Sequence, residues 1–289
     1  MPHSLTVQQR TIITLDANWA LGVLTVKQWL LVLFIMLNPL SLKAAEARDS
    51  DYFFTLDPNK VHASPTFSLA APSGLTPFQK VAFVGIGGSK NMPGRSVSVD
   101  GAMSTGFGFA LSEENKIGVL VGLDMGSINP SDGGAFDRGD LGLAIGKYFD
   151  KYNAGISLGV KSITLWHAAA GRNTPSVYLA ATKIAMLGEY RTIMNIGFGN
   201  NAFRTLYDTA SKSERSKRAS MFGSVAIYPL PQLSVVADYT AGIASIGLGI
   251  VPVAAWPVSL SLGLYDVTKE IKDHDKAAFI ASLGYSYSF

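Results

Sequence analysis

The stretch GAMSTGFGFALS, residues 101–112, decides the fold. Its larger side chains stand at every second position, and the positions between them hold only Gly, Ala or Ser. A side-chain period of two is typical of a β-strand, in which successive residues point to opposite faces of the sheet. The stretch therefore predicts a strand with one large, mainly apolar face and one nearly bare face.

The same alternation returns along the chain. It recurs in NKIGVLVGLDMGS (115–127), GDLGLAIG (139–146), AGISLGVK (154–161), RTIMNIGFG (191–199), LSVVADY (233–239), SIGLGI (245–250) and VSLSLGL (258–264). In a soluble sandwich, the second face would meet water and carry many Lys, Glu, Thr and Arg residues. Here that face is mostly Gly, Ala and Ser, as the lumen of a lipid-facing barrel allows. Segments of about ten residues also match the length that crosses a bilayer at a tilt.

The composition narrows the class of protein. Charged residues make up 16% of the chain, whereas about 25% is usual in soluble proteins. The net charge of +3 is too weak for a concentrated nucleic-acid-binding face. The chain contains no cysteine, which excludes disulfides and thiolate metal sites. We therefore expect no metal and no cofactor.

The connections between strands test the barrel independently. From a first strand at 78–88, long and short connections alternate, as in outer-membrane barrels. One exception is Ala241–Gly242, a tight connection where a long loop is expected. We predict an all-β fold: a transmembrane antiparallel up-and-down β-barrel of about 12 strands, with both chain termini on the periplasmic side.

The N-terminal region precedes this barrel. The apolar run WLLVLFIML, residues 29–37, is shorter than the ~20 residues of a spanning helix. With Lys27 before it and Ala45 and Ala47 after it, residues 1–47 are predicted to be a secretory signal peptide, the alternative being a membrane anchor. Residues 48–77 are then either a flexible periplasmic lead or a segment that folds back into the barrel mouth, and 78–289 form the outer-membrane barrel.

Alternation also selects the side chains that face the lumen. The candidates are Asp124, Lys161, Asp238, Lys116, Asp140, Tyr178, Tyr228 and Tyr265. Charged groups avoid the lipid face, because Arg or Lys at the bilayer midplane costs ~2 to 4 kcal/mol. Two interpretations are open: a water-filled channel carrying both charge signs, or Asp and Lys side chains that pair and close the lumen.

Catalysis would need a His close to a Ser. His167 follows Trp166 at a strand end, and Ser162 stands five residues earlier. In a regular strand this odd spacing places the two side chains on opposite faces. We therefore expect that the chain is not an enzyme.

A basic cluster occupies the long connection after residue 199. Its members are Arg204, Lys212, Arg215, Lys217 and Arg218. On the outer side of a membrane, such a cluster can meet the phosphates of lipopolysaccharide. The alternative is an ordinary solvated loop.

The C-terminal residues LGYSYSF resemble the assembly signal of Gram-negative outer-membrane β-barrels, which ends on Phe with apolar or aromatic residues at alternate positions before it. The matching residues are Leu283, Tyr285, Tyr287 and Phe289. The resemblance implies that the barrel-assembly machinery and outer-membrane lipid are partners. More loosely, DGAMSTGFGFAL and FGSVAIYPLPQLSVVADYTAG are similar to a group of uncharacterised cyanobacterial barrel proteins.

The function that these features favour is a passive pore or small-solute channel in the outer membrane. The alternative is a non-transporting structural or accessory barrel, serving envelope organisation or polysaccharide export. The oligomeric state is left open.

Overall fold

The computed structural model describes residues 63–91, 99–126, 128, 135–136, 138–166, 175–203, 220–269 and 277–289. All of them lie within Ala44–Phe289, the second of two units into which the chain divides. The predicted signal peptide and the basic cluster from Arg204 to Arg218 lie outside the described residues. No helix in the described part of the chain is long and apolar enough to cross a membrane.

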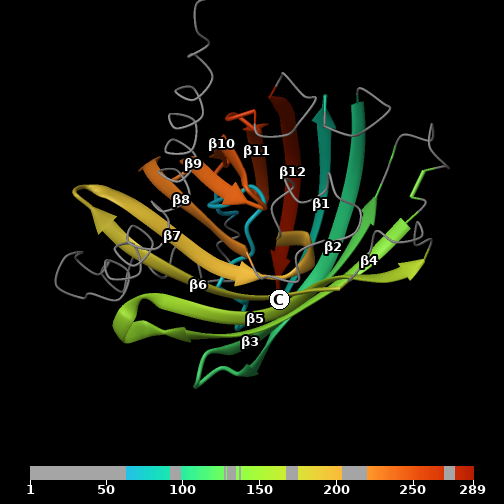
Figure 1. Cartoon of the computed structure of the whole chain (residues 1–289). Coiled ribbons are helices and arrows are strands. Elements are labelled where there is room, and N and C mark those ends of the chain that lie inside the picture. The colour runs from blue at the N-terminus through green and yellow to red at the C-terminus, as the bar shows by residue number, and fades with distance from the viewer. Residues whose placement is uncertain are drawn as a thin grey trace, which may run out of the picture. The chain divides into compact units, whose positions relative to one another are not determined.

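The described residues form a closed barrel of twelve antiparallel strands (Figure 1). The strands are β1 (Val81–Lys90), β2 (Val99–Ser112), β3 (Ile117–Gly126), β4 (Arg138–Phe149), β5 (Ala154–Trp166), β6 (Ser176–Leu187), β7 (Tyr190–Gly199), β8 (Ser220–Leu230), β9 (Leu233–Thr240), β10 (Ile243–Ile250), β11 (Val258–Tyr265) and β12 (Ala278–Ser288). Each strand pairs with its neighbours in sequence, and β1 pairs with β12. The prediction of a twelve-stranded up-and-down barrel is confirmed.

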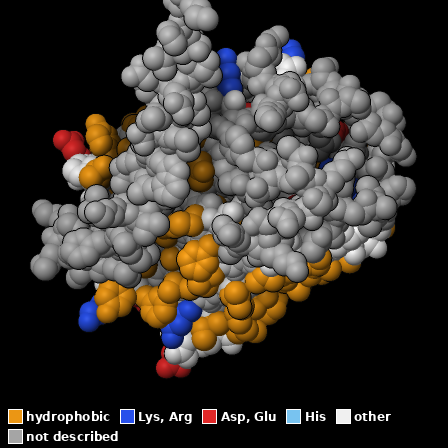
Figure 2. Space-filling model, in the orientation of Figure 1, with side chains coloured by type: hydrophobic (Ala, Val, Ile, Leu, Met, Phe, Trp, Pro, Cys, Tyr) orange, Lys and Arg blue, Asp and Glu red, His pale blue; other side chains and the backbone are white. Residues whose placement is uncertain are grey.

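The outer face of the barrel carries the large apolar residues of the alternating large–small pattern in each strand. Ile145, Leu158 and Phe198 expose 44%, 53% and 50% of their surface, as the predicted alternation requires. Figure 2 shows hydrophobic side chains gathered over the visible outer surface of the described strands. Water would not favour so much exposed apolar surface on a monomer, whereas lipid does.

The two ends of the barrel differ in their connections. At one end, called here the turn end, residues 113–116, 150–153, 188–189, 231–232 and 251–257 join the strands. The opposite end, called the loop end, carries the longer connections and the Ala241–Gly242 turn. Both residues of this turn have positive φ angles, 56° and 82°, as in a type I′ hairpin turn. This tight hairpin explains the exception in the alternation of loop lengths.

Two local features differ from the sequence-based expectation. Strand β1 begins at Val81 rather than at Phe78. In β5, the pairing with β4 shifts between Val160 and Ile163, and Ser162 between them has a φ angle of 61°. This β-bulge reverses the side-chain alternation beyond it, so that Ile163 pairs with the outward-facing Leu141.

Candidate functional site

The interior of the barrel is occupied along one side by the chain itself. Residues 63–80, called here the inner segment, precede β1 and run inside the ring of strands (Figure 1). The Tyr228 hydroxyl donates to the Pro65 carbonyl at 3.1 Å, and the Asn195 amide donates to the Pro72 carbonyl at 2.7 Å. These contacts join strands β8 and β7 to the backbone of the segment.

Asp238 binds the part of the inner segment that lies farthest from the turn end. Its Oδ2 atom accepts hydrogen bonds from the backbone nitrogens of Leu69, Ala70 and Ala71 at 3.0–3.1 Å and from the Ser68 hydroxyl at 2.7 Å. The carboxylate is 4% exposed. A buried charge is tolerated when it is fully hydrogen-bonded, and here a single turn of backbone surrounds it. We call residues 68–71 the apex.

The segment reaches the apex from the turn end and returns to it. Its rising limb, residues 63–67, lies by Ser234 near the start of β9, where the Ser234 hydroxyl donates to the Thr66 carbonyl. Its descending limb, residues 72–80, passes Thr182 of β6, whose hydroxyl accepts from the Gly74 nitrogen at 2.8 Å. It ends beside β12, where the Phe289 nitrogen donates to the Lys80 carbonyl at 3.2 Å.

The bare inner face of the strands is what makes room for this segment. A Cβ atom on Gly118 would lie 1.9 Å from the Pro77 carbonyl oxygen, and one on Gly146 would lie 2.7 Å from the Thr76 hydroxyl. Gly74 is enclosed in the same way by backbone atoms of Gly155, Ala181 and Thr182. Larger residues at these wall positions would exclude the segment.

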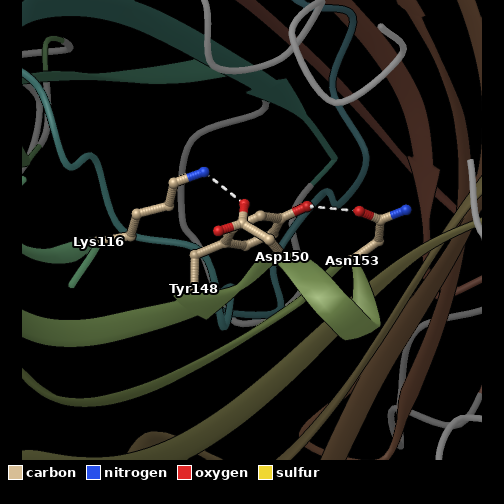
Figure 3. Close-up of polar contacts among 4 residues, drawn as sticks. All are labelled: Lys116, Tyr148, Asp150 and Asn153. Carbon is tan, nitrogen blue, oxygen red and sulfur yellow. Dashed lines mark hydrogen bonds and ion pairs between the residues drawn. The ribbon is translucent and has the colours of Figure 1, made fainter. Parts of the chain in front are cut away.

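At the turn end, aromatic and charged groups clasp the descending limb. The ring of Phe78 stacks on Tyr148 with centroids 6.1 Å apart, and the Lys116 ammonium lies 5.6 Å from the Phe78 centroid. Lys116 also forms an ion pair with Asp150, and the Tyr148 hydroxyl donates to Asn153 at 3.3 Å (Figure 3). These contacts explain why Phe78 belongs to the inner segment instead of extending β1.

A second group of aromatic rings fills the loop-end half of the lumen beside β5–β8. Phe203 lies 4.8 Å from Phe222 and 5.8 Å from Tyr178, measured between ring centroids. All three rings are buried. The Lys161 ammonium lies 4.6 Å from the Phe203 centroid, in a cation–π arrangement. The interior along these strands is therefore packed.

The opposite wall of the lumen, formed by β1, β2, β11 and β12, borders open space. One cavity of about 340 Å³ lies toward the loop end, and another of about 470 Å³ lies toward the turn end. We call them the loop-end cavity and the turn-end cavity. Both are bordered by Gly87, Ala102 and Ser282, so they adjoin. Serine and glycine dominate the inner wall here.

The eight predicted lumen residues do not gather at one site. Asp124 borders the turn-end cavity and pairs across the sheet with Asp140. Asp238 and Tyr228 instead hold the inner segment, and Tyr178 belongs to the aromatic group. These eight residues thus serve different parts of the interior.

The remaining three predicted residues complete this picture. Lys161 lies within electrostatic reach of both Asp124 and Asp238. Tyr265 pairs with Ser245 across β10 and β11. Lys116 lies in the turn before β3 and not within a strand.

The residues of the proposed assembly signal lie on the outer face of β12 and at its end. Leu283, Tyr285 and Tyr287 expose between 46% and 49% of their surface, and Phe289 exposes 68%. The rings of Tyr287 and Phe289 stack with centroids 6.3 Å apart.

Sequence reasoning missed most of the residues that bind the inner segment. Ser157, Thr182 and Ser234 each contact its backbone, yet small polar side chains on a lumen face carry no distinctive signal. Asp100, which borders the loop-end cavity, was also missed. Its place two residues before the alternating Ala102 is the signal that would have found it.

Solved structures that resemble the chain are outer-membrane β-barrels. The outer membrane phospholipase of Salmonella typhi, a dimer with bound calcium, is 10% identical over 74% of this chain and 92% of its own, with a TM-score of 0.45. Outer membrane phospholipase A from Escherichia coli is 11% identical over 74% and 98%, with a TM-score of 0.43. An outer membrane channel from Pseudomonas putida F1 is 13% identical over 81% and 100%, with a TM-score of 0.39. No protein-family model and no curated protein sequence matches the chain.

The expectation that the chain is not an enzyme is contradicted, since two of these structures are phospholipases, although the likeness is one of structure alone. The spacing argument behind it assumed a regular strand, whereas the β4–β5 pairing shifts at the bulge around Ser162 and again between Thr164 and Trp166. His167 lies outside the described residues.

Proposed function

We propose that this chain is an outer-membrane barrel that conducts small polar solutes and ions through a lumen narrowed by the inner segment. The apolar outer face and the strand lengths support a position in lipid. We further propose that residues 1–47 direct export, and that the barrel-assembly machinery recognises the C-terminal strand. Contact between the basic cluster and lipopolysaccharide remains part of this proposal.

The observation that carries the proposal is that the two cavities adjoin, sharing Gly87, Ala102 and Ser282 as bordering residues. Together they border β1 from Phe83 to Ser89. Seven residues of a strand cover about 20 Å at ~3.4 Å for each step. Because barrel strands tilt by ~40°, this length covers about 15 Å along the membrane normal, somewhat more than half of the ~25 Å apolar band of a membrane barrel. A path along this wall would therefore pass through more than half of that band.

The lining is mainly apolar, and its polar groups, serine hydroxyls and two carboxylates, are what favour polar solutes and cations. The turn-end cavity is bordered by three residues that carry hydroxyl groups, Ser104, Ser259 and Ser282. Among the described residues that border the two cavities, Asp100 and Asp124 are the charged ones. Rings of acidic side chains select cations in other pores, so we expect cations to pass more readily than anions.

A specific observation also favours the accessory role. The aromatic group and the inner segment fill the lumen beside β4–β9, as expected of a barrel with no transport of its own. Single-channel recording of the refolded mature protein separates the two. Steady openings of uniform size support the pore. A barrel that shows heat-modifiable mobility in gels, and is therefore folded, but passes no current would contradict it.

A further inference from the structure

The rising limb and apex of the inner segment differ from its descending limb in one respect. Thr66, Ser68 and Leu69 border the loop-end cavity, whereas no residue of 72–80 borders either cavity. The rising limb and apex therefore have free space on one side, although Gly249 lies close against Thr66, where an added Cβ would be 2.4 Å from the Thr66 nitrogen. The descending limb is wedged against Gly118, Gly146 and Gly155 of the wall.

The attachment of the apex is concentrated in one side chain. Three backbone N–H groups and the Ser68 hydroxyl converge on a single carboxylate oxygen of Asp238. The Ser68 hydroxyl shares its one hydrogen between Asp238 and the Ala71 carbonyl, each 2.7 Å away, and so also closes the turn. Hydrogen bonds to a charged acceptor are roughly twice as strong as neutral ones. Loss of this one group therefore removes the side-chain hydrogen bonds from the wall to the apex and leaves only the apolar packing of Leu69 and Ala71 against the two buried clusters.

We infer that the apex, residues 68–71, forms a gate, which Asp238 holds against β9 and away from the open path. This inference rests on the proposed pore. Released from Asp238, the apex moves into the adjoining loop-end cavity and obstructs it. The cavity of about 340 Å³ is small enough for a few side chains to fill. Asp238 itself does not border either cavity, so it acts by positioning the gate and not by contact with the passing ion.

The first test measures the position of the apex without any current. The natural chain has no cysteine, so Ala71→Cys places a single thiol at a position that is 8% exposed. In the Asp238→Ala background we expect this thiol to react with a maleimide about tenfold faster or more, because several charge-assisted hydrogen bonds are lost. The matched control is Ala70→Cys, which is exposed in the apex and should react rapidly in both backgrounds. Equal, slow labelling at Ala71→Cys in both backgrounds would overturn the gate.

The second test measures gating. Asp238→Ala should show closures about tenfold more frequent than the wild type, with the unit conductance of the open state unchanged. Asp238→Asn preserves the side-chain volume and one acceptor oxygen, and it should show a smaller increase in the same direction, which keeps the test valid if the Ala variant folds poorly. A stable increase in conductance in either variant would contradict closure by the apex. Because labelling requires no current, a failed gate and a failed pore give different results.

Discussion

Gly87 in β1 pairs with Ser282 in β12, and both residues border the loop-end cavity as well as the turn-end cavity. In the proposed pore, the path between the two cavities therefore runs past this pair. A Cβ atom on Gly87 would meet its nearest neighbours, Ala281 O and Ser282 Cβ, at 3.5 and 3.6 Å, which are ordinary contact distances. A side chain at residue 87 can thus be introduced without forcing the backbone apart.

Replacing Gly87 by Leu should narrow this passage. We expect single-channel conductance to fall by half or more while the barrel still folds, because the new side chain points into the lumen. Lys90→Leu is the matched control, since Lys90 of the same strand is exposed and borders neither cavity. Equal conductance in the two variants would show that the path does not run past residue 87.

Gly74→Ala should destabilise the packed half of the lumen. Its Cβ would lie 2.5–2.8 Å from backbone atoms of Gly155, Thr182 and Ala181, which cannot move aside cheaply. Overpacking of this kind costs about 1–3 kcal/mol, measured as a lower free energy of unfolding in urea by tryptophan fluorescence. Gly122→Ala is the control, because the nearest atom to its Cβ is Phe83 Cζ at 3.9 Å. A Gly74→Ala variant as stable as that control would show that the descending limb is loosely held.

Phe78→Leu should loosen the descending limb at the turn end. Loss of the stacked ring removes the contact with Tyr148 and the cation–π contact with Lys116, and aromatic pairs contribute about 0.5–1.5 kcal/mol beyond buried area. The expected result is a lower temperature for the heat-induced mobility shift in gels. Lys116→Gln should lower the free energy of unfolding by less than ~1 kcal/mol, because its ion pair with Asp150 is exposed. A larger loss of stability in Lys116→Gln than in Phe78→Leu would contradict this prediction.

Deleting Phe289 should impair assembly in cells more than stability. Phe289 is 68% exposed, and its ring stacks on Tyr287 at the surface, so refolding in detergent should yield nearly wild-type stability. Insertion into the outer membrane in cells should fall several-fold. Phe279→Ala is the control, because this Phe lies on the outer face at the other end of β12. Normal insertion of the deletion variant would count against recognition of the terminal Phe.

The barrel could be predicted from the sequence because lipid imposes a period of two on every strand. Phe107 and Leu158 expose their side chains while Gly106 and Gly159 line the interior, and each such dyad is a local signal. The number of strands follows because each connection is marked by polar or turn-forming residues. The I′ turn at Ala241–Gly242 illustrates this, since two adjacent residues with positive φ make a complete hairpin connection.

The path of the inner segment could not be predicted in the same way. Its contacts are made through backbone groups, such as the nitrogens of Leu69 to Ala71, and backbone groups are identical in every residue. The bulge at Ser162 was missed for a related reason, because a positive φ at a serine has no sequence signature comparable to that of glycine. The role of Asp238 depends on its contact with Ser68, which lies about 170 residues earlier in the chain, so neither residue reveals it alone.

The ion selectivity of single channels tests the central claim most directly. In a gradient of potassium chloride, the reversal potential of the wild type should show a preference for K⁺ over Cl⁻, because Asp100 and Asp124 border the path. Asp124→Asn should move the reversal potential toward zero, and the double variant with Asp100→Asn should move it further. A reversal potential that is unchanged in both variants, or a folded barrel that passes no current, would contradict a path along the β1 wall.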